Sequence, residues 1–214
     1  MLDLEKVMKR LSKKRPIFHS EADFQHALAW EIHELCPDCS IRLEYKPSNW
    51  ENRIYIDVWV SNTHTKMAIE LKYKTRKLTK KIREEIFDLS DQSAQDIGRY
   101  DLLKDIKRLE QIVKENKIIG YSIFLTNDSS YWKLSRSIKT VDADFRIHES
   151  RLLYGKLEWG SAASKGTTQR REDPIYLQGK YLLNWKEYSK PSKASYGIFR
   201  YLMLRVDYNN LFHE

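Results

Sequence analysis

Two carboxylates and a lysine, Asp57, Glu70 and Lys72, have the residue types and spacing needed for metal-assisted chemistry. They lie in two segments, 53–60 (RIYIDVWV) and 66–73 (KMAIELKY), in which apolar and polar side chains alternate with a period of two. Such alternation is typical of half-buried β-strands. Because the apolar sides of both strands must face one core, the polar sides with these three residues share the opposite face.

The register of this strand pair sets how close the two carboxylates lie. A tight connection centred on Thr63 and His64 would place Asp57 directly opposite Glu70, and a centre one residue earlier would make them diagonal neighbours. In either register their Cβ atoms are roughly 5–8 Å apart. Two carboxylates at this separation repel each other unless a cation lies between them, and a divalent metal ion is the natural choice.

Bulk composition restricts the class of protein. A chain of 214 residues is long enough for one domain with a full core and short for two, so we expect a single domain over 1–214. The net charge of +8 and pI of about 9.3 favour a polyanionic partner. No run of eighteen apolar residues is present and the N-terminus lacks the apolar stretch of a secretory signal, so we expect no membrane association.

The chain contains only two cysteines, in the run His33-x-x-Cys36-x-x-Cys39. Two cysteines do not make a disulfide framework, and a structural zinc site would need a fourth ligand and a second pair. We therefore interpret this run as a helix end and a turn. A reducing cytoplasm is the expected location.

The elements that must position the carboxylates can be assigned from periodicity, caps and prolines. A charged segment over 75–90 is expected to be a connecting helix or a mobile flap, and the unit from 66 to 125 a right-handed parallel crossover. In chain order we expect a helix over 3–14, a helix from Ser20 to about Leu35, strands over 41–46, 54–60 and 66–73, a helix over 91–116 and a buried strand over 118–125.

The last third of the chain has a weaker pattern. Residues 160–173 are rich in Ser, Gly, Thr, Gln and Arg, which predicts a surface loop. Residues 181–188 and 198–208 are expected to be strands. Their aromatic content favours completion of the core, with a specificity element or a dimer arm as alternatives.

Asp57 followed by Glu70-Leu71-Lys72 on adjacent strands, with these flanking elements, resembles the PD-(D/E)XK nuclease superfamily, which includes restriction endonucleases and junction resolvases. The resemblance covers residues 18–126, and Ile56 stands where the name-giving proline would be. It implies an α/β fold with a restriction-endonuclease-like core (αβββαβ), a mixed central sheet flanked by helices, and extra C-terminal strands from 127–214.

The resemblance also implies a mechanism. Asp57, Glu70 and the backbone carbonyl of Leu71 would hold Mg²⁺, or alternatively Mn²⁺, with waters completing the coordination. The ion would activate water for hydrolysis of a phosphodiester, and Lys72 would orient or help to deprotonate that water. Glu21 lies on the core-facing stripe of the first long helix, where many members place an additional metal-site carboxylate. An equally weighted alternative is that Glu21 favours its own helix N-terminus.

Candidate nucleic-acid contacts lie close to this site in the sequence. The basic run over 72–81 would follow the nucleic-acid backbone, although such charge runs are usually a solvated flap. For the helix that opens near Asp91 an ordinary polar surface is the favoured alternative to phosphate contact. The candidates are Gln25, beside Glu21, and Lys74, Arg76, Lys77, Gln95 and Arg99.

The leading functional hypothesis is a Mg²⁺-dependent nuclease that acts on DNA as an endonuclease, with the restriction, defence or mobile-element role typical of the superfamily. Cutting both strands of a duplex generally needs two sites, which would suit a homodimer. The first alternative is a non-catalytic nucleic-acid-binding module of the same fold. The second is a domain whose basic surface binds an acidic protein.

Overall fold

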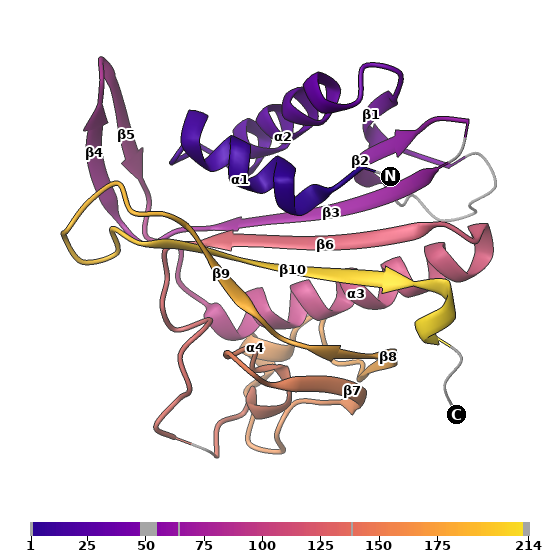
Figure 1. Ribbon diagram of the computed structural model, residues 1–214. Helices are drawn as coiled ribbons and strands as arrows, with labels where there is room; N and C mark the ends of the chain where they lie inside the picture. Colours follow the sequence, from indigo (N-terminus) through magenta and orange to yellow (C-terminus); the bar gives the residue numbers. More distant parts are fainter. Residues whose placement is uncertain (1, 48–54, 64, 138, 212–214) are drawn as a thin grey trace.

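The computed structural model describes residues 2–47, 55–63, 65–137 and 139–211 of the chain. It is a mixed α/β fold built on a six-stranded sheet, and helices lie on both faces of that sheet (Figure 1). The elements are α1 (Leu4–Lys14), α2 (Glu21–Leu35), β1 (Ser40–Tyr45), β2 (Ile56–Ser61), β3 (Lys66–Lys74), β4 (Leu78–Ile82), β5 (Glu85–Leu89), α3 (Gln95–Asn116), β6 (Ile119–Thr126), β7 (Leu152–Leu157), α4 (Lys165–Thr168), β8 (Ile175–Leu182), β9 (Trp185–Ser189) and β10 (Phe199–Asp207).

The strand order of the main sheet is β1-β2-β3-β6-β10-β9. β2 is antiparallel to β1 and to β3, β6 is parallel to β3, and β10 is antiparallel to both of its neighbours. The predicted parallel crossover is confirmed, because α3 connects β3 to the parallel strand β6. The sheet is therefore mixed, as the sequence predicts.

The N-terminal helices begin where their capping residues predict. Ser20 Oγ accepts a hydrogen bond from the Asp23 N–H at 3.1 Å, which satisfies one of the free amides at the start of α2. In the same way the Asp3 carboxylate accepts from two amides at the start of α1. Both helices bury an apolar stripe against the sheet, including Phe24, Leu28 and Ile32 of α2.

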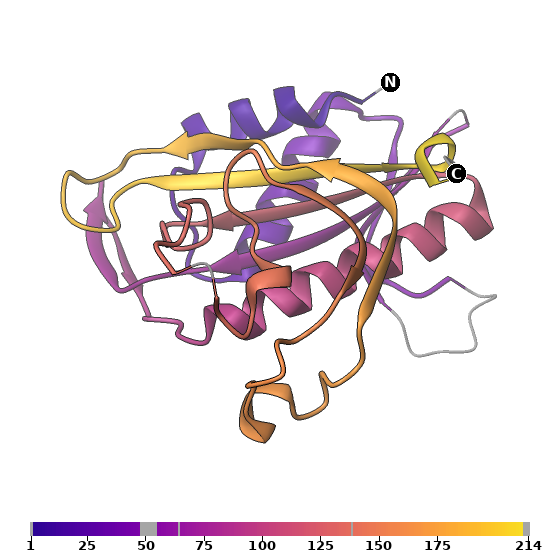
Figure 2. The same ribbon diagram turned by 90° about the horizontal axis from the view of Figure 1, so that it is seen from below.

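Two apolar layers lie on opposite faces of the sheet, beneath the elements that Figures 1 and 2 show on each side. α1 and α2 cover one face, and α3 with the separate β7–β8 pair covers the other. Strand β6 lies between both layers, which explains its nearly continuous apolar run. Consequently the polar face of β3, which carries Glu70 and Lys72, lies beneath α3.

The segment over 75–90 forms a β-hairpin, β4–β5, and the prediction of a connecting helix is wrong. Leu78, Phe87 and Leu89 are its buried side chains, and they pack on the layer formed by α1 and α2. Their alternation with exposed charged residues has the period of a strand, which the many lysines obscured. The helix α3 starts at Gln95 instead of Asp91, because Ala94 adopts a left-handed backbone (φ 64°) at its N-cap.

The C-terminal third both completes the sheet and covers α3, which agrees with the prediction of core completion. The predicted strand over 198–208 is confirmed as β10. The predicted single strand over 181–188 is two strands: β8 pairs with β7, and β9 pairs with β10. The predicted loop over 160–173 contains one short helix, α4.

Cys36 and Cys39 form a single disulfide directly after α2, which the sequence analysis did not predict. The predicted helix end and turn at this place are confirmed. The two cysteines are brought close by this turn, in which the Cys39 N–H donates to the Cys36 carbonyl at 2.9 Å. Within the described ranges no helix is long and apolar enough to cross a membrane.

Candidate active site

The β2–β3 register brings the two predicted carboxylates together. Val58 pairs with Ile69, and the pairs that follow keep the same register. Continued by one residue, this register sets Asp57 directly opposite Glu70. It is the first of the two predicted arrangements, with the connection centred at 63–64; His64 itself lies outside the described residues.

Beyond Ile69, backbone amides of β3 donate hydrogen bonds to carboxylates and not to a partner strand. Asp57 Oδ2 accepts a hydrogen bond from the Leu71 N–H at 2.6 Å, and Glu21 Oε2 accepts one from the Tyr73 N–H at 2.7 Å. Because the N–H and C=O of one strand residue point to the same edge, the Leu71 carbonyl also lies on the side of Asp57. The edge therefore presents both carboxylate and carbonyl oxygens.

Glu70 is the most constrained of these acids, with only 2% of its surface exposed. Its Oε2 forms an ion pair with Arg108 Nη2 at 2.5 Å, whereas its Oε1 is buried without a hydrogen-bond partner among the described residues. Burial raises the pKa of Glu70 well above its ordinary value, Arg108 opposes this, and the neighbouring Asp57 and Asp105 carboxylates add to it. This carboxylate thus has an unused acceptor oxygen.

Lys72 is held in a chain of charges under α3. Its Nζ contacts Asp105 Oδ2 at 2.7 Å, and Asp105 also pairs with Arg108 at 3.2 Å. Burial by itself would lower the pKa of Lys72, but Asp105, Glu21 and Asp57 together raise it. Lys72 is therefore a charged donor at neutral pH, suited to orient a water or neutralise a phosphate oxygen more than to remove a proton.

Burial raises the pKa of Asp57 to about 6, against the lowering effects of the Leu71 N–H and Lys72. The Glu21 and Glu44 carboxylates raise it further. Glu44 lies level with Asp57 on β1, where its backbone is left-handed (φ 48°). A bulky residue in that region is an outlier that often marks a functional site.

Sequence reasoning missed Glu44, Asp105 and Arg108. The first lies in the strand expected over 41–46, where nothing in the pattern singled it out. The other two are an i, i+3 pair on α3 that points at β3. Their only local signal is charge on the otherwise apolar, sheet-facing side of a long helix. Recognising them required knowing which strand α3 covers.

These oxygen ligands suit a divalent ion that keeps several waters better than an ion coordinated by protein groups alone. The described part of the chain contains no group of three His, Cys, Asp or Glu side chains arranged to hold a metal. Glu21 is accordingly engaged with the Tyr73 N–H instead of completing a three-carboxylate cluster. Mg²⁺ commonly binds through one or two carboxylates and keeps several waters, which suits Asp57, Glu70 and the Leu71 carbonyl.

Two of the predicted nucleic-acid contacts are packing residues. Gln25 is buried, and its Nε2 donates to the Asp57 carbonyl at 2.7 Å and to Glu44 Oε1 at 2.8 Å, so it positions both acids. Arg99 is only 3% exposed and pairs with Asp142 at 2.6 Å. A side chain so placed does not reach a surface ligand, so Arg99 is structural.

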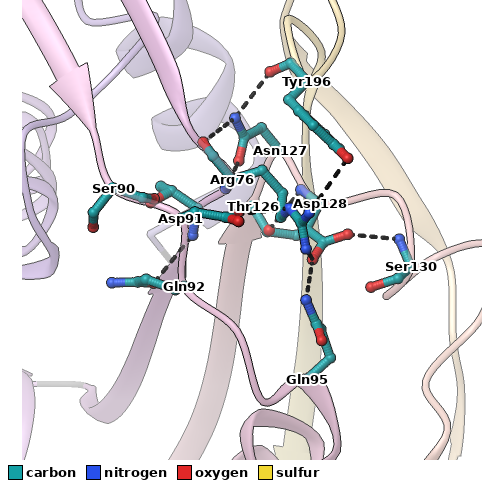
Figure 3. A network of polar contacts seen from close by, with 11 residues as sticks. Arg76, Ser90, Asp91, Gln92, Gln95, Thr126, Asn127, Asp128, Ser130 and Tyr196 are labelled. Carbon is teal, nitrogen blue, oxygen red and sulfur yellow. Dashed lines mark hydrogen bonds and ion pairs between the residues drawn. The ribbon is translucent and has the colours of Figure 1, made fainter.

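The other four predicted contacts lie near the carboxyl end of β3, and Figure 3 shows two of them, Arg76 and Gln95 at the start of α3. Lys74 is half-buried at the end of β3, and Lys77 is exposed. Arg76 pairs with Asp91 at 2.8 Å, and Gln95 Nε2 donates to Asp128 Oδ2 at 2.9 Å. The row of cations that starts at Lys72 thus continues toward this end of the sheet through Lys74, Arg76 and Lys77. Gln95 is engaged in the polar network of Figure 3.

Comparisons of the chain with models of protein families, with curated proteins and with solved structures find no match. The class of protein must therefore be inferred from the residues and their geometry.

Proposed function

We propose that this protein is a metal-dependent nuclease of the restriction-endonuclease-like class, which hydrolyses phosphodiester bonds in DNA. One observation carries the proposal. Glu70 is a buried carboxylate with an unpartnered oxygen, it lies opposite Asp57, and the charged Lys72 follows two residues later. Structural carboxylates at this depth are normally fully hydrogen-bonded, so the spare oxygen favours a cationic ligand.

The fold supports the proposal. With the β4–β5 hairpin inserted between β3 and α3, the order α2-β1-β2-β3-α3-β6, with three antiparallel strands and β6 parallel to β3, agrees with the αβββαβ core that the resemblance implies. The candidate residues lie where β2 and β3 separate, so their edge is not closed by ladder hydrogen bonds. A substrate phosphate can be recognised there by side chains and by the Leu71 carbonyl.

In the proposed mechanism Asp57, Glu70 and the Leu71 carbonyl hold Mg²⁺ or Mn²⁺. When bound, the ion lowers the pKa of a water and stabilises charge on the phosphate. Lys72 donates hydrogen bonds to the attacking water or to a phosphate oxygen, and Asp105 restrains its ammonium group. Gln25 keeps the Asp57 backbone in place.

The positive charge of the chain favours a polyanionic substrate. Lys74, Arg76 and Lys77 follow Lys72 along β3 and its extension, and a row of cations can track successive phosphates. A restriction, defence or mobile-element role and a homodimer that cuts both strands accord with the proposed class.

A cleavage panel tests the proposal. Supercoiled plasmid, linear duplex, single-stranded DNA, a branched junction and structured RNA are incubated with Mg²⁺, with Mn²⁺ and with EDTA, beside Glu70→Ala. Metal-dependent cleavage that disappears in the variant supports the nuclease. Cleavage that persists in Glu70→Ala or in EDTA would point to a contaminant or to another site.

The alternative, a non-catalytic nucleic-acid-binding module of the same fold, is favoured by one observation. Arg108 already occupies Glu70 Oε2, and an internal cation can replace a metal ion. Binding to nucleic acid that is equal in EDTA and in Mg²⁺, with no cleavage of any substrate, would support this alternative.

A further inference from the structure

A second feature suited to nucleic acid lies at the far end of the sheet, away from the carboxylates. The connection between β9 and β10 (residues 190–198) encloses a hollow of about 510 Å³ with the segment after β6. Figure 1 shows this connection at the end of the sheet from which the β4–β5 hairpin projects. Its volume lies within the usual range of small-molecule sites.

The hollow combines aromatic and cationic side chains. Its lining includes Trp132, Tyr196, Lys133 and Arg200, and none of the described residues that line it is acidic. Neither cation forms an ion pair within the described part of the chain, and the Arg200 guanidinium lies 5.7 Å from the Trp132 ring centroid. By contrast, the hollows beside α1 mix acidic with basic side chains.

Tyr196 lines this hollow with its backbone held, and its hydroxyl accepts a hydrogen bond from Arg76 Nη2 at 3.5 Å. Its backbone is left-handed (φ 62°), a state that a bulky residue keeps only when its surroundings impose it. The buried Asn127 imposes it: its Nδ2 donates to the Tyr196 carbonyl at 2.9 Å and to the Arg76 carbonyl at 3.2 Å (Figure 3). Tyr196 as a whole is nevertheless 40% exposed. An exposed aromatic ring on a restrained backbone is pre-organised for stacking.

The hollow is connected to the candidate active site through β3. The Arg76 guanidinium lies 5.0 Å from the centroid of the Tyr196 ring, and Arg76 follows Lys72 and Lys74 at every second residue. Lys74 pairs with Thr126, which in turn pairs with Arg200. Glu70 lies four residues before Lys74, which is roughly 13 Å along a strand, and Arg200 lies two strand spacings, roughly 10 Å, further across the sheet.

We propose that this hollow binds one unstacked base of a single-stranded nucleic-acid segment. The base would stack on Tyr196, and the flanking phosphates would contact Arg200 and Lys133. Aromatic platforms combined with cations are the general means by which proteins bind single strands without reading sequence. The inference rests on the proposed nucleic-acid substrate and deepens it, because it names a single-stranded region near the cut.

The test measures binding of a fluorescent 12-nucleotide single-stranded DNA, an RNA of equal sequence and the corresponding duplex, all in EDTA so that nothing is cut. The main variant is Tyr196→Asn, because asparagine tolerates a left-handed backbone but offers no ring. Tyr196→Phe keeps the ring. Tyr176→Asn is the matched control, because Tyr176 on β8 is 54% exposed and does not line the hollow.

We expect Tyr196→Asn to weaken single-strand binding roughly 5- to 150-fold, the range for loss of one stacked base. Tyr196→Phe and Tyr176→Asn should change it less than twofold, and duplex binding should not respond to Tyr196→Asn. When 2-aminopurine replaces each base of the strand in turn, its fluorescence should be quenched at one position. Only the wild type and Tyr196→Phe should cause this quenching. The RNA arm shows whether the base comes from DNA or RNA.

The outcomes separate the two proposals. If Tyr196→Asn binds single strands as the wild type does, or weakens duplex binding equally, the base-binding hollow is overturned while cleavage can still stand. If Tyr196→Asn has the expected effect but the wild type cuts nothing with Mg²⁺, the hollow stands and the nuclease falls. If the wild type binds no nucleic acid, both fall.

Discussion

Glu70 and Glu110 are two glutamates with equal burial and opposite surroundings. Each is 2% exposed. Glu110 of α3 accepts hydrogen bonds from the Gln178 and Gly179 amides and from the Tyr181 hydroxyl, at 2.7–2.9 Å, so both of its oxygens are satisfied. Glu70 has one ion pair and one buried oxygen without a described partner. Burial is therefore the same for the two acids, and hydrogen-bond satisfaction is what distinguishes them.

The difference has a physical cost. A buried carboxylate that is fully hydrogen-bonded stabilises the fold, but one with an unused acceptor destabilises it. Glu110 fastens β8 to α3 and needs no ligand. Arg108 compensates only part of the cost at Glu70, because Oε1 keeps no described hydrogen-bond partner, and such a group is a candidate for a binding site.

The largest expected effect is on catalysis. Glu70→Gln preserves shape but removes the charged ligand, so we expect metal-dependent cleavage to fall at least roughly 10²- to 10³-fold. Thermal unfolding in EDTA should show no loss of stability, because a buried charge has been neutralised. Initial cleavage rates and melting temperatures measured on the same preparations check this. Cleavage at the wild-type rate would remove Glu70 from the site.

The reciprocal variant should affect stability alone. Glu110→Gln replaces one acceptor oxygen with an amide nitrogen that must face at least the Gln178 N–H, which should lower the free energy of unfolding by roughly 1–3 kcal/mol. Urea unfolding measures that loss, and the cleavage rate per folded molecule should stay within twofold of wild type. If instead cleavage falls while stability is retained, the roles assigned to the two glutamates are wrong.

A smaller effect should depend on pH. The Asp57 pKa of about 6 is above its ordinary 3.8 chiefly because of burial. A raised folded-state pKa gives stability that is present below about pH 4 and is lost as pH rises through 6. Asp57→Asn changes the free energy of unfolding by a different amount at each pH. In EDTA, we expect this change to be more stabilising at pH 7.5 than at pH 4 by up to about 3 kcal/mol.

Urea unfolding at both pH values checks this, with exposed Asp38→Asn as the control. Equal effects of Asp57→Asn at pH 4 and pH 7.5 would show that ionised Asp57 carries no cost in the fold.

The smallest expected effect concerns Arg108. Arg108→Gln removes the only described cation that contacts Glu70, which should lower metal-free stability by about 1–2 kcal/mol, since Arg108 is 30% exposed. Millimolar Mg²⁺ should then raise the melting temperature of the variant more than that of the wild type. Lys107→Gln, an exposed neighbour on α3, is the control. An equal response to Mg²⁺ in all three proteins would contradict a metal ion at Glu70.

Much of the secondary structure could be predicted from local pattern. The helices with clear caps, the strands β1, β2, β3 and β6, and the parallel crossover follow from periodicity and turn chemistry. The β4–β5 hairpin was missed because its exposed face is nearly all charged, which conceals a period of two. The strand over 181–188 was misassigned because the pattern does not show that the chain changes partner between β8 and β9.

The candidate site was predictable only in part, because local pattern gives the face on which a residue lies but not the element that covers it. Side-chain alternation is a property of the strand backbone, so the sequence by itself determined that Asp57, Glu70 and Lys72 share one face and that Asp57 lies close to Glu70. Which element covers that face depends on packing between residues distant in the chain. Only the tertiary structure therefore decided that Arg108 and Asp105 reach these residues from α3, that Arg99 is buried, and that one oxygen of Glu70 has no described partner.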